Sequence, residues 1–268
     1  MSEEIGQPRE AAAEKGKDYL GRAPVGKLLL KLAIPTVVAQ LINMLYNIVD
    51  RIYIGHMPEN GQAALTGLGV CMPLILLVSA FAALIANGGA PRASIFMGRG
   101  DQESAERPLG NCFGTQIFIS VVLTALLLIF NEQFLWWFGA SGETIGYATD
   151  YMNIYAVGTL FVQLTLGMNA FITAQGFATT GMLSVLIGAL ANIALDPLFI
   201  YAFGMGVQGA ALATIISQAA SCVWVLFFLF GKRTMLKIRP RFFRLQAGII
   251  LPCLALGFST FVMQASES

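Results

Sequence analysis

Charged residues are scarce in this chain of 268 residues, where they make up 12% of the sequence, and histidine occurs only once. Soluble domains carry about twice that share of charge, so a soluble enzyme is not expected. The net charge of +1 also gives no global attraction for nucleic acid. His56 has no second histidine with which to share a metal ion, and no nucleophile is paired with a base. We therefore expect neither an enzyme nor a nucleic-acid-binding protein, and no catalytic residues.

Cysteine is also rare, with four residues in the whole chain. They lie far apart within or near apolar stretches, and no two of them show the Cys-x-x-Cys spacing of a metal or redox site. We expect all four to be packing residues: Cys71, Cys112, Cys222 and Cys253.

Apolar residues, in contrast, make up 56% of the chain, and the mean hydropathy is +0.70. A run of about 20 apolar residues is long enough to cross the hydrocarbon core of a bilayer. Six complete runs are expected at about residues 28–55, 64–89, 109–130, 147–173, 180–202 and 208–230, and a seventh opens near Gly248. The predicted fold is an all-α polytopic membrane protein, with a six-helix transmembrane bundle and the start of a seventh helix.

Basic residues are distributed unevenly between the loops. Fifteen of the sixteen lie in the leader, in the loop after the second run or in the loop after the sixth, whereas the alternate loops hold only Arg51. Because Lys and Arg are retained on the cytoplasmic side, this predicts a cytoplasmic amino terminus in a cell membrane, plasma or inner. We expect residues 1–27 to be a polar cytoplasmic tail without a signal peptide, 28–231 the bundle, 232–245 a basic cytoplasmic linker, and 246–268 the truncated start of a second lobe.

A stripe of polar residues runs through the first apolar segment. The spacings of 4, 3, 4 and 3 residues place its members on one helical face: Thr36, Gln40, Asn43, Asn47 and Asp50. Hydrocarbon offers no partners to amides or carboxylates, so this face must meet a protein interior or an aqueous cavity. The stripe predicts a path for a solute or an ion.

A second polar group lies in the fifth segment. Asn192 and Asp196 are four residues apart on one helical face, and Pro197 frees a backbone carbonyl nearby. These hard oxygen ligands suit Na⁺, or a proton held by the acid. The structural alternative is that Asp196 only satisfies backbone donors beside a proline kink.

Depth along the helices places the acids in one layer. At about 1.5 Å per residue, Asp50, Asp196 and Thr214 all lie roughly 24 to 28 Å from the inner face. A shared site of these residues with Asn192 is therefore expected, although Asp50 can also be interpreted as a helix-end acid near water beside Arg51. Two carboxylates in such a layer repel each other, and Na⁺ or H⁺ would relieve that repulsion.

Several segments together resemble the multidrug and toxic compound extrusion (MATE) transporters. They are Leu32-Ala-Ile-Pro-Thr-x-x-x-Gln40, Ile48-Val-Asp-Arg51, Ser94-Ile-Phe-Met-Gly-Arg-Gly-Asp101, Leu195-Asp-Pro-Leu-Phe-Ile200 and Gly206-Val-Gln-Gly-Ala-Ala-Leu-Ala-Thr214. The resemblance implies a twelve-helix exporter of two six-helix lobes, of which this chain is the amino-terminal one. It implies a cation site at Asp50, Asn192, Asp196 and Thr214 and a cavity lined by Gln40 and Asn43, to which the stripe adds Asn47.

The resemblance further implies that such a transporter exports drugs, organic cations or amphipathic metabolites in exchange for Na⁺ or H⁺. It implies no cofactor, and its partners would be the bilayer and the missing carboxyl-terminal lobe. Two alternatives stay open, a lipid-linked oligosaccharide flippase of the same superfamily and a channel or non-transporting membrane scaffold.

An internal repeat supports two lobes independently. Leu32, Thr36, Val38 and Gln40 recur at a constant offset of 224 residues as Leu256, Thr260, Val262 and Gln264. Six helices lie between the two copies, and an even number implies parallel repeats related by an axis along the membrane normal. The seventh helix is thus predicted to be the first helix of a second repeat.

Overall fold

The computed structural model describes residues 24–58 and 60–266. Most of the predicted cytoplasmic tail therefore lies outside the described residues. Within them the chain is all-helical, and seven helices are long and apolar enough to cross a membrane. These helices are α2 (Val25–Gly55), α3 (Gly61–Gly98), α4 (Gln102–Trp137), α5 (Ile145–Ala174), α6 (Ala178–Pro197), α7 (Gly206–Phe230) and α8 (Ala247–Ser266). The predicted polytopic fold is confirmed.

Two short elements interrupt the pattern. A π-helix, η1 (Leu198–Ala202), follows α6 directly, and a 3₁₀ turn, η2 (Pro240–Phe242), lies between α7 and α8. The longest helix, α3, has 38 residues, which corresponds to about 57 Å. It exceeds the hydrocarbon thickness of about 30 Å, so the apolar run predicted its existence but not its length.

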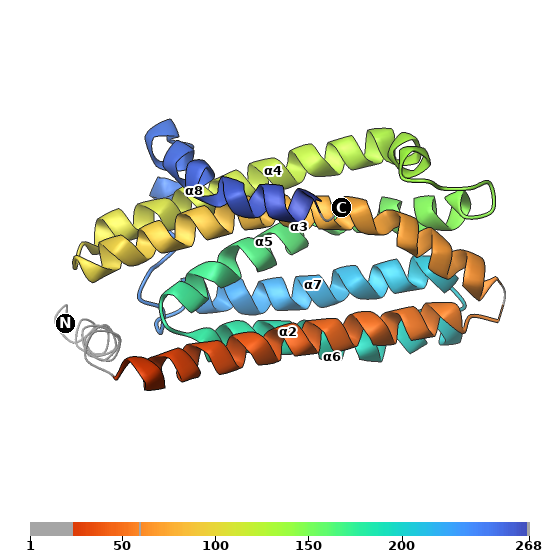
Figure 1. Ribbon diagram of the computed structural model, residues 1–268, viewed down its shortest axis with the longest axis horizontal. Coiled ribbons are helices and arrows are strands. Elements are labelled where there is room, and N and C mark those ends of the chain that lie inside the picture. Colours follow the sequence, from red (N-terminus) through yellow and green to blue (C-terminus); the bar gives the residue numbers. More distant parts are fainter. Residues whose placement is uncertain (1–23, 59, 267–268) are drawn as a thin grey trace.

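The helices run nearly parallel to the long axis of the molecule (Figure 1). Helices α2, α6 and α7 form one side, α3, α4 and α8 the other, and α5 packs between them against α3, α4 and α7. Only Pro35, Asp50 and Ile54 of α2 are buried. Helix α2 is therefore attached to the bundle along α6, and most of its surface is open.

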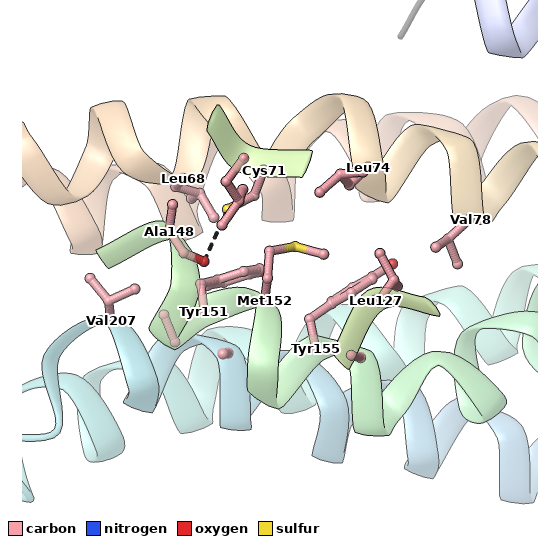
Figure 2. Close-up of a cluster of buried hydrophobic side chains, with 14 of the residues drawn as sticks. Leu68, Cys71, Leu74, Val78, Leu127, Ala148, Tyr151, Met152, Tyr155 and Val207 are labelled. Atoms are coloured by element: carbon pink, nitrogen blue, oxygen red, sulfur yellow. Dashed lines mark hydrogen bonds between the residues drawn. The ribbon is translucent and has the colours of Figure 1, made fainter. Parts of the chain in front are cut away.

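The core consists of two groups of buried apolar side chains. One lies toward the end of the bundle that carries the α2–α3 turn and includes Leu68, Leu74 and Met152 (Figure 2). The other lies toward the opposite end, around Phe171 and Leu229. All four cysteines are buried and free, as the prediction of packing residues requires. The Cys71 thiol donates to the Ala148 carbonyl at 3.5 Å, which joins α3 to α5.

The turn between α3 and α4 ends in a helix cap. Asp101 is the N-cap of α4, and its carboxylate accepts a hydrogen bond from the Ser104 backbone N–H at 3.0 Å. An N-cap oxygen satisfies a helix donor that has no partner within the helix. The glycines around Arg99 and Asp101 therefore belong to a helix turn.

The segment between α7 and α8 is held by buried polar side chains of α4 and α5. We call Glu106, Asn111 and Gln175 the linker cluster. The Gln175 carbonyl oxygen accepts from the Thr234 hydroxyl at 2.9 Å and from the backbone N–H groups of Met235 at 2.8 Å and Leu236 at 2.9 Å.

The other two residues of the linker cluster bind farther along the same segment. Glu106 pairs with Arg239, and its carboxylate accepts from the Lys237 backbone at 3.3 Å. Asn111 donates to the Phe242 carbonyl at 3.1 Å and accepts from the Gln246 backbone at 2.9 Å. The predicted basic linker is thus docked on the bundle over most of its length.

Candidate cation and substrate site

A cavity of about 440 Å³ lies between α2 and α3. Its floor is formed by α5 and α7, and α8 contributes Gln264. The volume falls within the range of about 300 to 1,000 Å³ that is typical of small-molecule pockets. The cavity is therefore large enough for a drug-sized ligand.

The polar face of α2 borders this cavity as the sequence predicts. Gln40, Asn43, Asn47 and Asp50 all line it. Thr36 does not, and its hydroxyl donates to the Leu32 carbonyl at 2.8 Å within the helix. The stripe thus reaches the cavity along its last three turns.

Two carboxylates from different helices meet beside the cavity: Asp50 lines it, and Asp196 lies behind Asp50 and does not line it. Asp50 of α2 is 8% exposed and Asp196 of α6 is fully buried. Their carboxyl groups lie close enough to interact with each other. When both are ionised neither supplies a hydrogen, and one oxygen of each has no partner among the described residues. A shared proton or a bound cation would satisfy these oxygens.

The two remaining predicted ligands lie beside the acids. The Asn192 side chain donates to Asp196 at 3.1 Å, and its own carbonyl oxygen is buried without a partner in the part of the chain that the structure describes. Asn192 and Thr214 together line a small hollow of about 50 Å³, and Thr214 also lines the large cavity with Asp50. We call Asp50, Asn192, Asp196 and Thr214 the acid cluster.

The local sequence explains how α6 presents Asp196. Pro197 lacks a backbone N–H, and the α-helix ends there and continues as the π-helix η1. Gly209 of α7 permits close packing, because a Cβ at this position would lie 2.8 Å from the Phe199 backbone of η1. The Tyr201 hydroxyl then donates to the Tyr53 carbonyl at 2.6 Å and ties η1 to α2.

Several cavity residues escaped the sequence analysis. Tyr151 and Tyr155 of α5 stack with their ring centroids 6.2 Å apart and form part of the floor (Figure 2). Tyr151 lines the cavity together with Thr214 and Asp50, so the floor adjoins the acid cluster. Asn87 and Gln218 add further amides. Helix α5 is apolar on most faces, so periodicity gave no signal for its tyrosines.

The acid cluster offers carboxylate, amide and hydroxyl oxygens. Among residues 24–58 and 60–266 no three His, Cys, Asp or Glu side chains gather in a way that could hold a metal ion. A tightly bound transition metal is therefore not indicated by these ligands. Hard oxygen ligands of this kind fit Na⁺ or a proton instead.

A family model described as MatE matches residues 35–198, which include the whole polar stripe of α2 and the acids Asp50 and Asp196. The chain belongs to the MatE family. The match covers more than half of the sequence and confirms the family resemblance. The MatE family is a family of multi-pass membrane transporters, and the seven helices of spanning length agree with that architecture.

Curated relatives of this MatE chain include multidrug export proteins named MepA. The protein of Staphylococcus haemolyticus is 24% identical over 245 residues, which are 91% of this chain and 54% of that protein. The protein of Staphylococcus aureus strain NCTC 8325 is 22% identical over the same shares. The chain thus spans about half the length of the curated relatives it matches.

Solved structures share the fold of this MatE chain. A MOP superfamily transporter from Pyrococcus furiosus has a TM-score of 0.85 at 28% identity, covering 94% of this chain and 55% of that one. A MATE protein solved in complex with MaD3S gives 0.86 at 28% identity, with 94% and 56% covered. The fold therefore corresponds to about one half of these transporters.

Proposed function

We propose that this chain is the cation-binding half of a membrane antiporter that exports organic cations, drugs or other amphipathic small molecules in exchange for Na⁺ or H⁺. The observation that carries the proposal is the facing pair Asp50 and Asp196, on two different helices, beside a drug-sized cavity. The MepA relatives, which are named as multidrug export proteins, support the substrate class.

The position of Asp50 suggests how exchange arises. Asp50 lines the large cavity and also faces Asp196. An organic cation in the cavity and a small cation at the acid cluster are therefore both attracted by the negative charge of Asp50. Each weakens the binding of the other, and such reciprocal coupling is what exchange requires. The same oxygens serve Na⁺ and H⁺, so the coupling ion is left open in this proposal.

The arrangement in the membrane is part of the same proposal. The distribution of basic residues supports a cytoplasmic amino terminus in the cell membrane. Residues 28–231 would form the first lobe, 232–245 the linker between lobes, and 246–268 the beginning of a second lobe. A separate carboxyl-terminal lobe is the proposed partner that completes the transporter.

Efflux of ethidium from cells without their own exporters tests the proposal. The chain is expressed as its 268 residues and also joined to the carboxyl-terminal lobe of a MatE relative. We expect efflux that depends on Na⁺ or on pH, and we expect Asp196→Asn to abolish it at unchanged expression. Glu143→Gln is the matched control, because Glu143 is exposed and lines neither the cavity nor the small hollow.

Unchanged efflux in Asp196→Asn would refute the assignment of the cation site. Absence of efflux from every well-expressed form would refute the antiporter proposal and favour the flippase or the scaffold.

A further inference from the structure

The backbones of helices α8 and α3 pack in close contact. A Cβ on Gly88 of α3 would overlap the Cys253 carbonyl of α8, and a Cβ on Gly257 of α8 would overlap the Leu84 carbonyl of α3. One turn farther, the rings of Phe81 and Phe261 have their centroids 5.0 Å apart. Residue numbers rise along α8 as they fall along α3, so the helices are antiparallel. These contacts fix both the rotation and the register of α8.

The fixed register brings Gln264 to the cavity. Gln264 lies about one turn beyond Phe261 and lines the cavity together with Ser79 of α3. The carbonyl oxygen of its side chain is buried and has no hydrogen-bond partner among the described residues. An amide oxygen without a donor is costly in a protein interior. A ligand N–H group in the cavity would supply that donor when the amide turns toward it.

The internal repeat gives Gln264 an equivalent residue in α2. Gln264 is the equivalent of Gln40 at the offset of 224 residues, and Gln40 lines the same cavity from α2. Helix α8 starts the second repeat by sequence, yet it completes a cavity built by the first. The two repeat-related amides therefore border one binding space.

We propose that Gln264 is a specificity-determining residue that accepts a hydrogen bond from an N–H group of the bound organic cation. This inference rests on the proposed function of the cavity as a cation-binding site. A carboxylate such as Asp50 attracts any cation, because charge attraction has little directionality. An amide acceptor distinguishes a protonated amine, which has an N–H, from a quaternary ammonium, which has none. The cavity should therefore favour protonated amines.

The test uses the purified 268-residue chain in detergent and two dansyl sulfonamides that differ only in their tails. One tail ends in a protonated dimethylammonium group and the other in a trimethylammonium group. Dansyl fluorescence measures both dissociation constants at pH 7. We expect the wild-type chain to bind the protonated amine about tenfold more tightly, the size of one charge-assisted hydrogen bond.

Three variants test whether the preference for the protonated amine depends on Gln264. Gln264→Met has a similar length but no acceptor, and we expect the two ligands to bind equally. Gln264→Glu keeps an acceptor and should keep the preference, so this variant tests the proposal even if Gln264→Met does not fold. Met263→Leu is the matched control on the adjacent, 59% exposed position of α8 and should leave the preference unchanged.

The outcomes separate this inference from the proposed function. Binding of neither ligand to the wild-type chain would overturn the proposed function and the inference together. Binding of both ligands with no preference, or with a preference that persists in Gln264→Met, would overturn the inference alone. Loss of the preference only in Gln264→Met supports it.

Discussion

The linker cluster and the acid cluster are both groups of buried polar side chains, yet they differ in how their polar atoms are satisfied. In the linker cluster the Gln175 oxygen has three donors, and Glu106 is paired with Arg239. In the acid cluster one oxygen on each of Asp50, Asn192 and Asp196 has no partner in the described residues. Buried polar groups are normally satisfied, and an unsatisfied set needs an explanation. We interpret the first cluster as structural and the second as a binding site.

The largest expected effect is in the linker cluster. Gln175→Ala removes one acceptor and leaves the donors on Thr234, Met235 and Leu236 without it. The Thr234 hydroxyl retains the Leu236 carbonyl as an acceptor at 2.8 Å. At about 1 kcal/mol for each of the two backbone donors, we expect the free energy of unfolding to fall by about 2 kcal/mol. Thermal unfolding of the detergent-solubilised chain measures the change. Gln208→Ala, at an exposed position, is the control and should unfold like the wild type. Equal midpoints for both variants would contradict a structural role for this cluster.

The acid cluster should behave in the opposite way. In the double variant Asp50→Asn with Asp196→Asn, the repulsion between the carboxylates is gone, so stability without a bound cation should not fall. Stabilisation by ligand should disappear, which for the wild type is about 1.4 kcal/mol at a cation concentration ten times the dissociation constant. The measurement is the unfolding midpoint in NaCl and in choline chloride, and at two pH values. If the variant loses as much stability as Gln175→Ala, the acids are structural.

The smallest effect is expected at Asp101, which lies outside the spanning segments. Its carboxylate accepts a hydrogen bond from the Ser104 backbone N–H. Hydrogen bonds from the side chain and the backbone of Ser104 hold the pKa of Asp101 below its ordinary value of 3.8. Because the folded-state pKa is depressed, the contribution to stability is present above pH 3.8 and is lost as the pH falls through the folded-state pKa. Asp101→Ala should lower the unfolding midpoint slightly at neutral pH and remove this acid-dependent loss.

Asp101→Asn is the matched control for that prediction. An asparagine also caps helices well but does not titrate there. It should keep the neutral-pH midpoint and lack the acid-dependent loss. A loss of the same size in all three proteins would assign it to other acids.

The sequence predicted the helices and the acid cluster because both depend on periodicity. Residues at spacings of three and four share a helical face, and apolar runs of sufficient length span a bilayer. Depth placed Asp50 and Asp196 in one layer and so permitted a shared site, but the sequence could not show that their helix faces converge. Thr36 is the exception on the stripe: both Thr36 and Asn47 donate to a carbonyl of their own helix, yet of these two only Asn47 lines the cavity. The spacing of the polar residues could therefore not show that Thr36 lies away from the cavity.

The remaining features depend on tertiary contacts, which produce no periodic pattern of residues in the sequence. Tyr151 and Tyr155 have the same residue type and spacing whether they form a core or a cavity floor. Gln175 binds mainly backbone N–H groups about 60 residues away, and backbone donors are the same for every residue type. The docking of the linker could therefore not be predicted from the residues that it contains.

The docked linker also has a consequence for the order of assembly during synthesis. Glu106, Asn111 and Gln175 all precede in the chain the segment that they bind. Translation proceeds from the amino terminus and earlier parts fold first, so the receiving surface on α4 and α5 is complete before residues 234–246 leave the ribosome. The six spanning helices α2 to α7 all precede the linker, and the surface of α4 and α5 sets where the following helix, α8, begins.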